Sequence, residues 1–181
     1  VDGLNQLKRQ WFWYRVGAGG PEASIDTLLQ GPNGATDTDF DGYNDTYFTR
    51  YFGTDFTLDL RYSLTGGLAG SNSGSIATDI LITNTGNSAL FFNLFAYSDF
   101  DVNGTILNDT LQFVNANAVR QKDGQSVLES AYTPPPAHYE GTFSGFTLAS
   151  LLDGGPTTLN DLPAIGDPPI GPSDLTWSLQ W

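Results

Sequence analysis

The chain of 181 residues is long enough to bury one substantial core but short for two full domains. Its 20 acidic and seven basic residues give a formal net charge of -13, which argues against partners that bind clustered Lys and Arg, namely nucleic acids and anionic membranes. The absence of Cys excludes disulfides, thiolate metal sites and cysteine nucleophiles, and no apolar run approaches the roughly 20 residues of a membrane-spanning helix.

The composition favours an all-β fold. Only Glu22, Glu129 and Glu140 among the 20 acids are Glu, and Asp is typical of turns and oxygen-ligand loops rather than of helix surfaces. Gly (21) and Pro (10) are abundant, and 13% aromatic residues are too many for a disordered acidic tail. We therefore expect an antiparallel β-sandwich, jelly-roll-like, with one short helix and long loops rich in Asp, Gly and Pro.

The chain opens with an aromatic, strand-like segment, "LKRQWFWYRV", that carries three of the seven basic residues. We expect residues 1–16 to form a strand segment of their own, and residues 17–181 to form a single β-sandwich domain. The aromatic side chains are interpreted as core or subunit contacts, with stacking on sugar rings as the alternative. They are Trp11, Phe12, Trp13 and Tyr14.

Three strands are predicted in the middle of the chain. Apolar residues alternate from Phe56 to Leu64, which is typical of a half-buried antiparallel strand that Gly66 and Gly67 end. Strands are also expected over 75–84 and 89–101, joined by "TGNS" as a tight hairpin. Because both faces of the second are bulky, it is predicted to lie centrally between covering layers.

Further strands are predicted over "DTLQFVNANAVRQ", "QSVLESAYT" and "YEGTFSGF", with a turn at "KDG". "TLASLLDGG" is predicted to be a helix capped by Thr147, and "ASIDTLLQ" a weaker helical turn. "GDPPIGPSD" is interpreted as a stiff connector. The last segment alternates Trp177 and Trp181 with polar residues and ends on its last apolar residue, so we expect the parent polypeptide to continue.

The stretch "DTDFDGYND" is the strongest candidate metal loop. Asp37, Asp39 and Asp41 would point inward, Tyr43 would offer its carbonyl and Asp45 would close the cage, with Gly42 at the bend. Ca²⁺ takes six to eight oxygen ligands, and loops of the form D-x-D-x-D-G supply them compactly. An EF-hand is excluded because its twelfth position is Phe48. The alternative is a solvated acidic turn.

A second stretch, "DFDVNGTILND", has the same form. It offers Asp99, Asp101, Asn103, the Thr105 carbonyl and Asp109. The alternatives are a hairpin turn with "NG" at its apex and a single site shared by the two loops. Mg²⁺ fits less well because it demands tighter octahedral geometry, and zinc fits poorly because the chain has no Cys and one His.

No enzymatic motif stands out. His138 and Glu140 are the only acid–base pair, and a lone His beside Tyr at a strand start is more often a structural hydrogen-bonding group. No nucleophile elbow, zinc-protease motif or phosphate-binding Gly loop occurs. Three N-x-T sequons, at Asn44, Asn103 and Asn108, are candidate glycosylation sites.

Seven strings along the chain together resemble one family. They are "QWFWYRVG", "LRYSLTGG", "ITNTG", "FAYSDFD", "AHYEGTF", "TTLND" and "TWSLQW", and they span nearly the whole chain. The set is similar to secreted bacterial all-β proteins of the PEP-CTERM type, which an exosortase sorts. The resemblance implies export, an all-β fold and association with extracellular polymer or the cell surface. It supplies no reaction, and the sorting signal is absent from this sequence.

These features predict a non-enzymatic extracellular structural protein, stabilised by Ca²⁺. Its copies are expected to assemble into a filament or surface matrix by β-strand addition at an exposed edge left by the last strand, with residues 1–16 as the donor. Trp177 and Trp181 are assigned to the same assembly contacts as the N-terminal aromatics. The alternative is a secreted calcium-dependent carbohydrate-binding module, which would add polysaccharide as a partner; a secreted polysaccharide hydrolase fits least well.

Overall fold

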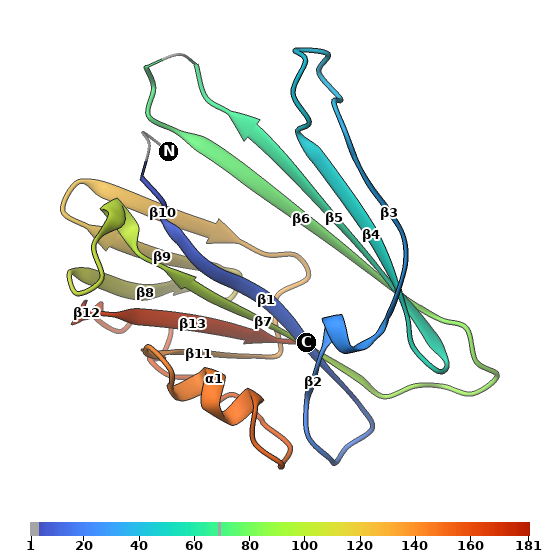
Figure 1. Ribbon diagram of the computed structural model, residues 1–181. Helices are drawn as coiled ribbons and strands as arrows, with labels where there is room; N and C mark the ends of the chain where they lie inside the picture. The colour runs from blue at the N-terminus through green and yellow to red at the C-terminus, as the bar shows by residue number, and fades with distance from the viewer. Residues whose placement is uncertain (1–3, 69) are drawn as a thin grey trace. The chain divides into compact units, whose positions relative to one another are not determined.

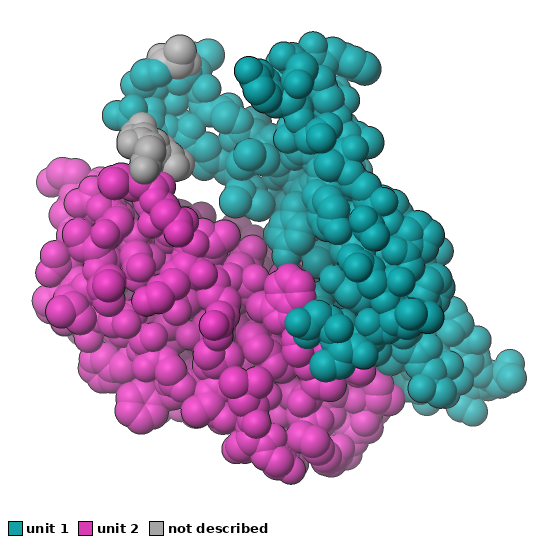
Figure 2. Space-filling view, in the orientation of Figure 1, with its two compact units in different colours: residues 1–2, 25–90 teal, residues 3–24, 91–181 magenta. Residues whose placement is uncertain are grey.

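The computed structural model describes residues 4–68 and 70–181 (Figure 1). In this part of the chain almost all regular structure is antiparallel β, with one short helix, α1 (Phe146–Leu151). The expected all-β antiparallel sandwich is confirmed. The chain forms two compact units, residues 25–90 and residues 4–24 with 91–181 (Figure 2). Residues 1–3 of the expected N-terminal segment lie outside the described residues.

The larger unit contains two sheets. The five-stranded sheet has the order β11-β13-β7-β1-β2, and the four-stranded sheet the order β10-β9-β8-β12. The strands of the first are β1 (Leu7–Val16), β2 (Ala23–Ser24), β7 (Phe92–Phe100), β11 (His138–Phe143) and β13 (Leu175–Gln180). Those of the second are β8 (Asp109–Asn115), β9 (Ala118–Asp123), β10 (Ser126–Ala131) and β12 (Ile170–Ser173).

A shared apolar cluster makes these two sheets a sandwich. It combines residues of the smaller sheet with residues of β13 in the larger one, and all are at most 3% exposed. Alternating inward residues from two facing sheets are the usual core of such a fold. The members are Leu111, Phe113, Val119, Leu175, Trp177 and Leu179.

The prediction that residues 89–101 form a central strand is confirmed by β7, which lies between β13 and β1 and is buried from Asn93 to Asp99. One of its faces packs with Trp13 of β1 and Leu151 of α1. The helix thus covers one face of the five-stranded sheet, and the four-stranded sheet covers the other. This double cover explains why both faces of the strand are bulky in sequence.

The smaller unit is a single four-stranded sheet with the order β3-β4-β5-β6. The strands are β3 (Leu29–Thr36), β4 (Thr46–Phe52), β5 (Phe56–Gly66) and β6 (Gly74–Asn84), preceded by a 3-10 turn at Ile25–Thr27. β5 has the bounds expected from its alternation. Its inward residues are buried only as far as Leu60, and Leu64 is 56% exposed.

Several local predictions are wrong. "TGNS" is no hairpin, because β6 belongs to the smaller unit's sheet and β7 to the five-stranded sheet. The "NG" of residues 103–104 is no hairpin apex either, because β7 and β8 belong to different sheets and a 3-10 turn, Val102–Gly104, separates them. "DTLQFVNANAVRQ" is two strands, β8 and β9, paired as a hairpin.

Two more corrections concern the end of the chain. Gly145, not Thr147, precedes the first turn of α1, and the buried Thr147 lies inside the helix. The last strand, β13, does not leave an exposed edge, because it pairs with β11 on one side and with β7 on the other.

The "KDG" turn between β9 and β10 and the helical turn at Ile25–Thr27 are confirmed. In the described residues, no helix has the length and apolar character needed to span a membrane.

Candidate functional site

Two groups of three aspartates stand out among the described residues. One contains Asp37, Asp39 and Asp45 in the smaller unit, and the other contains Asp99, Asp101 and Asp174 in the larger unit. In each group, every residue offers one carboxylate oxygen, and these oxygens lie within 4.8 Å of one another. Like charges at this distance repel each other unless a cation or hydrogen-bond donors lie between them.

The first group lies in the loop that joins β3 to β4, whose ends are held by the pair Thr36 and Thr46. Its carboxylates are already hydrogen-bonded. Asp37 accepts from the backbone N–H of Phe40 at 2.7 Å and of Gly42 at 2.8 Å. Asp45 accepts from the backbone N–H and the hydroxyl of Thr38. The loop therefore holds its shape through its own donors.

Hydrogen bonds from Thr38 also lower the pKa of the Asp45 carboxyl. Asp41, the fourth aspartate predicted as a ligand, lies outside the group. The Asp41 carboxylate accepts from the backbone N–H of Tyr43 at 2.8 Å, and the Tyr43 side chain is 78% exposed. Phe40, three residues earlier in the loop, is 90% exposed. The structure thus brings together three of the four aspartates predicted from "DTDFDGYND".

The second group is assembled by strand pairing rather than by one loop. Asp99 is near the end of β7, Asp101 follows that strand, and Asp174 immediately precedes β13. In the register of β7 with β13, Asp99 lies opposite Thr176. This pairing brings a residue 73 positions later (174 − 101) beside the end of β7.

The second group is also more buried than the first. Asp99 is 7% exposed, and Asp101 and Asp174 are partly buried. The Oδ1 atoms of all three are buried and accept no hydrogen bond from any described residue. Burial raises the pKa of Asp99, and the charge of Asp174 raises it further; Lys8 and Arg9 on β1 act in the opposite direction.

Of the other three residues predicted from this loop, only Asp109 has a carboxylate, and it lies outside the group. Asn103 lies in the 3-10 turn with φ of 61°, and the Thr105 hydroxyl donates to Asp123 at 2.5 Å. Asp109 accepts from Gln121 Nε2 at 2.6 Å. The sequence pattern therefore located Asp99 and Asp101 but missed Asp174.

Asp109 is a buried carboxyl with an unusual titration. It is 1% exposed, and burial raises its pKa from 3.8 to about 6 despite hydrogen bonds from Gln121 and the Val102 backbone. The folded protein therefore binds a proton at Asp109 more tightly than the unfolded chain does. The stability that this proton contributes is full below pH 4 and is lost as the pH rises through about 6.

Asp109→Asn should remove this pH dependence. Asn keeps the oxygen that accepts from Gln121 and carries no charge to bury. We expect the midpoint of thermal unfolding, in metal-free buffer, to fall between pH 4 and pH 6 more steeply in the unsubstituted protein than in the variant. Equal slopes in the two proteins would contradict this assignment.

The aromatic residues assigned to assembly pack within the larger unit. Phe12, Trp13 and Trp177 are at most 4% exposed. Trp11 donates its indole N–H to Ser24 at 2.7 Å, and Trp181 donates to the Pro134 carbonyl at 2.8 Å. The ring of Tyr14 stacks on Phe92 at 5.9 Å. These contacts suit core packing and leave little aromatic face for a sugar ring.

His138 and Glu140 each have a separate partner. His138 Nδ1 lies 3.0 Å from Asp161 Oδ2, and Glu140 accepts from the hydroxyl of Thr147. Asp161 also accepts from the backbone N–H of Tyr139 at 3.1 Å. These bonds tie β11 to the segment before β12 and to α1, as expected of structural groups.

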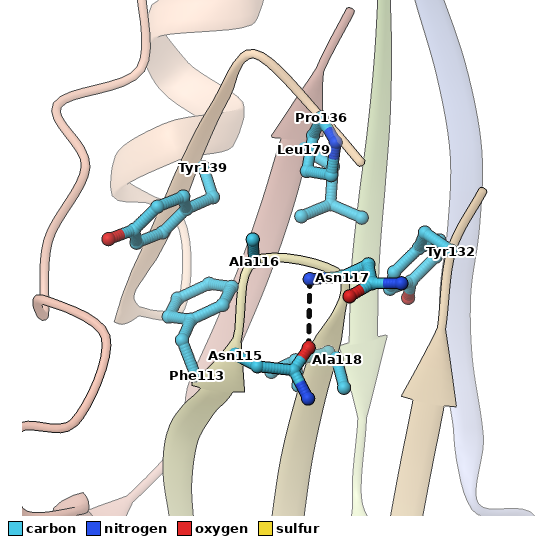
Figure 3. A pocket seen from close by; sticks show the side chains of 10 residues that line it. Phe113, Asn115, Ala116, Asn117, Ala118, Tyr132, Pro136, Tyr139 and Leu179 are labelled. Carbon is cyan, nitrogen blue, oxygen red and sulfur yellow. Dashed lines mark hydrogen bonds between the residues drawn. The ribbon is translucent and has the colours of Figure 1, made fainter. Parts of the chain in front are cut away.

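A pocket in the larger unit opens between the β8–β9 turn and β11 (Figure 3). Phe113, Tyr139 and Leu179 form apolar walls, and the backbone N–H of Asn117 donates to the Asn115 side chain across the turn. Tyr132, on the other side, has its phenol pKa raised by burial. The lining contains no carboxylate, His or Lys, so it provides no acid–base pair.

All three sequon asparagines, Asn44, Asn103 and Asn108, are exposed.

Comparisons with protein-family models, with curated proteins and with solved structures found no match.

Proposed function

We propose that the protein is a non-enzymatic structural subunit that acts outside the cell and polymerises when each copy supplies its β1 to the next copy. The resemblance to secreted PEP-CTERM-type proteins supports the extracellular setting, as does the lack of Cys and Met, which suits oxidising surroundings. The position of β1 in its sheet is the observation that carries the proposal.

β1 is the first strand in the described residues and is an interior strand of its sheet. It pairs with β7 from Leu7 to Val16 and with β2 on its other side. Phe12 and Trp13 are 3% and 4% exposed, so the sheet depends on the strand for part of its core. The slot between β7 and β2 must therefore be filled, either by the same chain or by another copy.

A glycine-rich segment follows β1 directly. Residues 17–20 read Gly-Ala-Gly-Gly, with Gly17 and Gly20 at φ of +91° and +88°. A Cβ added at Gly17, Gly19 or Gly20 would meet no neighbour, so side-chain packing does not constrain these glycines, and the Gly17 backbone N–H donates to the Phe91 carbonyl at 2.8 Å. Exchange of a strand about such a hinge is a low-cost route to assembly, because the contacts in the sheet are the same in both arrangements.

If β1 of each copy enters the slot of the next, the contact is head-to-tail and the product is an open fibre. The buried ion pair between Arg15 of β1 and Glu22, beyond the hinge, would then join two copies. The proposed structural role therefore depends on β1, which the five-stranded sheet requires and which either the same copy or a neighbouring copy can supply.

A double variant, Gln10→Cys with Ser98→Cys, tests this arrangement. The two residues are register partners on β1 and β7, and the natural chain has no Cys, so any disulfide reports this pair. After refolding at high concentration and oxidation, we expect a ladder of covalent multimers on a non-reducing denaturing gel.

Each single-cysteine variant is the control and should give at most a dimer. A double variant that stays entirely monomeric, with its thiols consumed in an intrachain disulfide, would contradict the proposal. A dimer with no higher bands would show closed reciprocal exchange and contradict head-to-tail assembly.

A further inference from the structure

We propose that Asp99, Asp101 and Asp174 form a Ca²⁺ site at the junction of β7, β12 and β13. The inference is independent of the assembly described above, because all three residues lie in the body of the larger unit and none lies on β1.

The burial of Asp99 is the observation that distinguishes this group from an ordinary acidic surface. Its side chain is on an interior strand, is 7% exposed and has an Oδ1 with no hydrogen-bond donor among the described residues. A buried carboxylate oxygen without a donor is costly to desolvate, so it requires a compensating charge or proton. Asp101 and Asp174 each also have a buried Oδ1 without a described donor, and each places a carboxylate oxygen within 4.8 Å of a carboxylate oxygen of Asp99.

Neighbouring cationic side chains do not supply that charge directly. Lys8 and Arg9 on β1 are near enough to influence Asp99, and Arg9 is its register partner across the strands. Neither comes within ion-pair distance of the three carboxylates in the part of the chain that the structure describes. A small cation among the three oxygens would satisfy all of them at once.

The ligand chemistry favours Ca²⁺. The group offers only carboxylate oxygens, which are hard ligands, and contains no His or Cys to favour zinc or copper. Ca²⁺ tolerates irregular coordination completed by backbone carbonyls and water, whereas Mg²⁺ requires a near-ideal octahedron. Asp99 and Asp101 come from the end of β7 and the start of the 3-10 turn after it, and Asp174 lies between β12 and β13, so the ligands come from two separate segments.

The loop of Asp37, Asp39 and Asp45 serves as the matched comparison. It also has three carboxylates with oxygens within 4.8 Å of one another, but Asp39 is exposed and all three accept backbone or hydroxyl hydrogen bonds. Asp39→Asn therefore removes one charge from an acidic trio, just as Asp174→Asn does, without touching the buried group.

The experiment measures thermal unfolding of the full chain in EDTA and then with CaCl₂, with MgCl₂ at equal ionic strength as the ion control. At a Ca²⁺ concentration 100-fold above Kd, we expect the midpoint to rise by about 5–10 °C in the unsubstituted protein and in Asp39→Asn. Asp174→Asn should lose this rise.

In EDTA, the order of the melting temperatures of the unsubstituted protein and Asp174→Asn should reverse. Asp174→Asn should melt at or above the temperature of the unsubstituted protein, because it relieves repulsion among three carboxylates. This crossover separates a cation site from a purely structural role, in which the substitution would be harmful or neutral in both buffers. Asp101→Asn, at another partly buried ligand, should show the same crossover if Asp174→Asn fails to fold.

The proposal is overturned if Ca²⁺ does not shift the midpoint of the unsubstituted protein, or if both Asp174→Asn and Asp101→Asn keep the full shift. Loss of the shift in Asp39→Asn alone would place the ion in the β3–β4 loop instead. An equal shift with Mg²⁺ would overturn the assignment to Ca²⁺.

Discussion

Trp177→Ala is expected to lower the free energy of unfolding by about 3–5 kcal/mol, because it leaves a large cavity where the two sheets of the sandwich meet. Trp177 is 1% exposed. Its ring stacks on Phe100 at 6.3 Å and meets the edge of Tyr132 at 5.6 Å, so it joins β7 to the segment after β10. Few positions in this core combine so large a side chain with contacts to both layers.

Chemical denaturation followed by fluorescence or circular dichroism measures this loss. Phe91→Ala is the control, because Phe91 is also aromatic but 64% exposed, and its loss should change stability by no more than about 0.5 kcal/mol. A Trp177→Ala variant within about 1 kcal/mol of the unsubstituted protein would show that the two sheets do not depend on this side chain.

Glu22→Ala is expected to destabilise the protein by a similar amount, about 3–5 kcal/mol, because it leaves the Arg15 guanidinium buried without its counter-charge. Arg15 is 6% exposed, and the Glu22 side chain is fully buried. Arg15 also donates to the Thr157 carbonyl at 2.8 Å and lies 5.7 Å from the centre of the Phe95 ring. The Thr157 backbone N–H donates to Glu22 at 2.9 Å and closes the network.

The double variant Arg15→Met with Glu22→Leu separates pairing from burial. Since it removes both charges and fills similar volume, it should recover most of the stability that Glu22→Ala loses, as denaturant titration would measure. A double variant at least as unstable as Glu22→Ala would mean that the polar contacts to Thr157, rather than the unpaired charge, dominate.

The sequence predicted single strands better than their partners. The alternation in residues 56–64 and the double-faced bulk of residues 89–101 reflect local burial, so β5 and the centrality of β7 could be foreseen. Neither pattern indicates which sheet a strand joins. The "TGNS" hairpin failed for this reason, because β6 and β7 end in different sheets although four turn-forming residues separate the patterns.

The carboxylate groups show the same limit. The linear D-x-D motif contains Asp99 and Asp101. Their third partner, Asp174, lies in the proline-rich stretch "GDPPIGPSD", for which the sequence predicts only a connector. Only the pairing of β13 with β7 brings Asp174 to them, and no spacing rule in the sequence encodes that pairing. Conversely, Asp109 fits the motif but accepts a hydrogen bond from Gln121. The pairing of β8 with β9, in which Thr110 lies opposite Lys122, brings these two side chains together.

The proposal that β1 is supplied from copy to copy is tested most directly by electron microscopy of the unsubstituted chain after refolding at high and at low concentration. Because exchange requires two molecules, we predict filaments that lengthen with protein concentration and are built from one repeating subunit. Particles of monomer size alone at every concentration would contradict the proposal, and β1 would then serve only the chain to which it belongs.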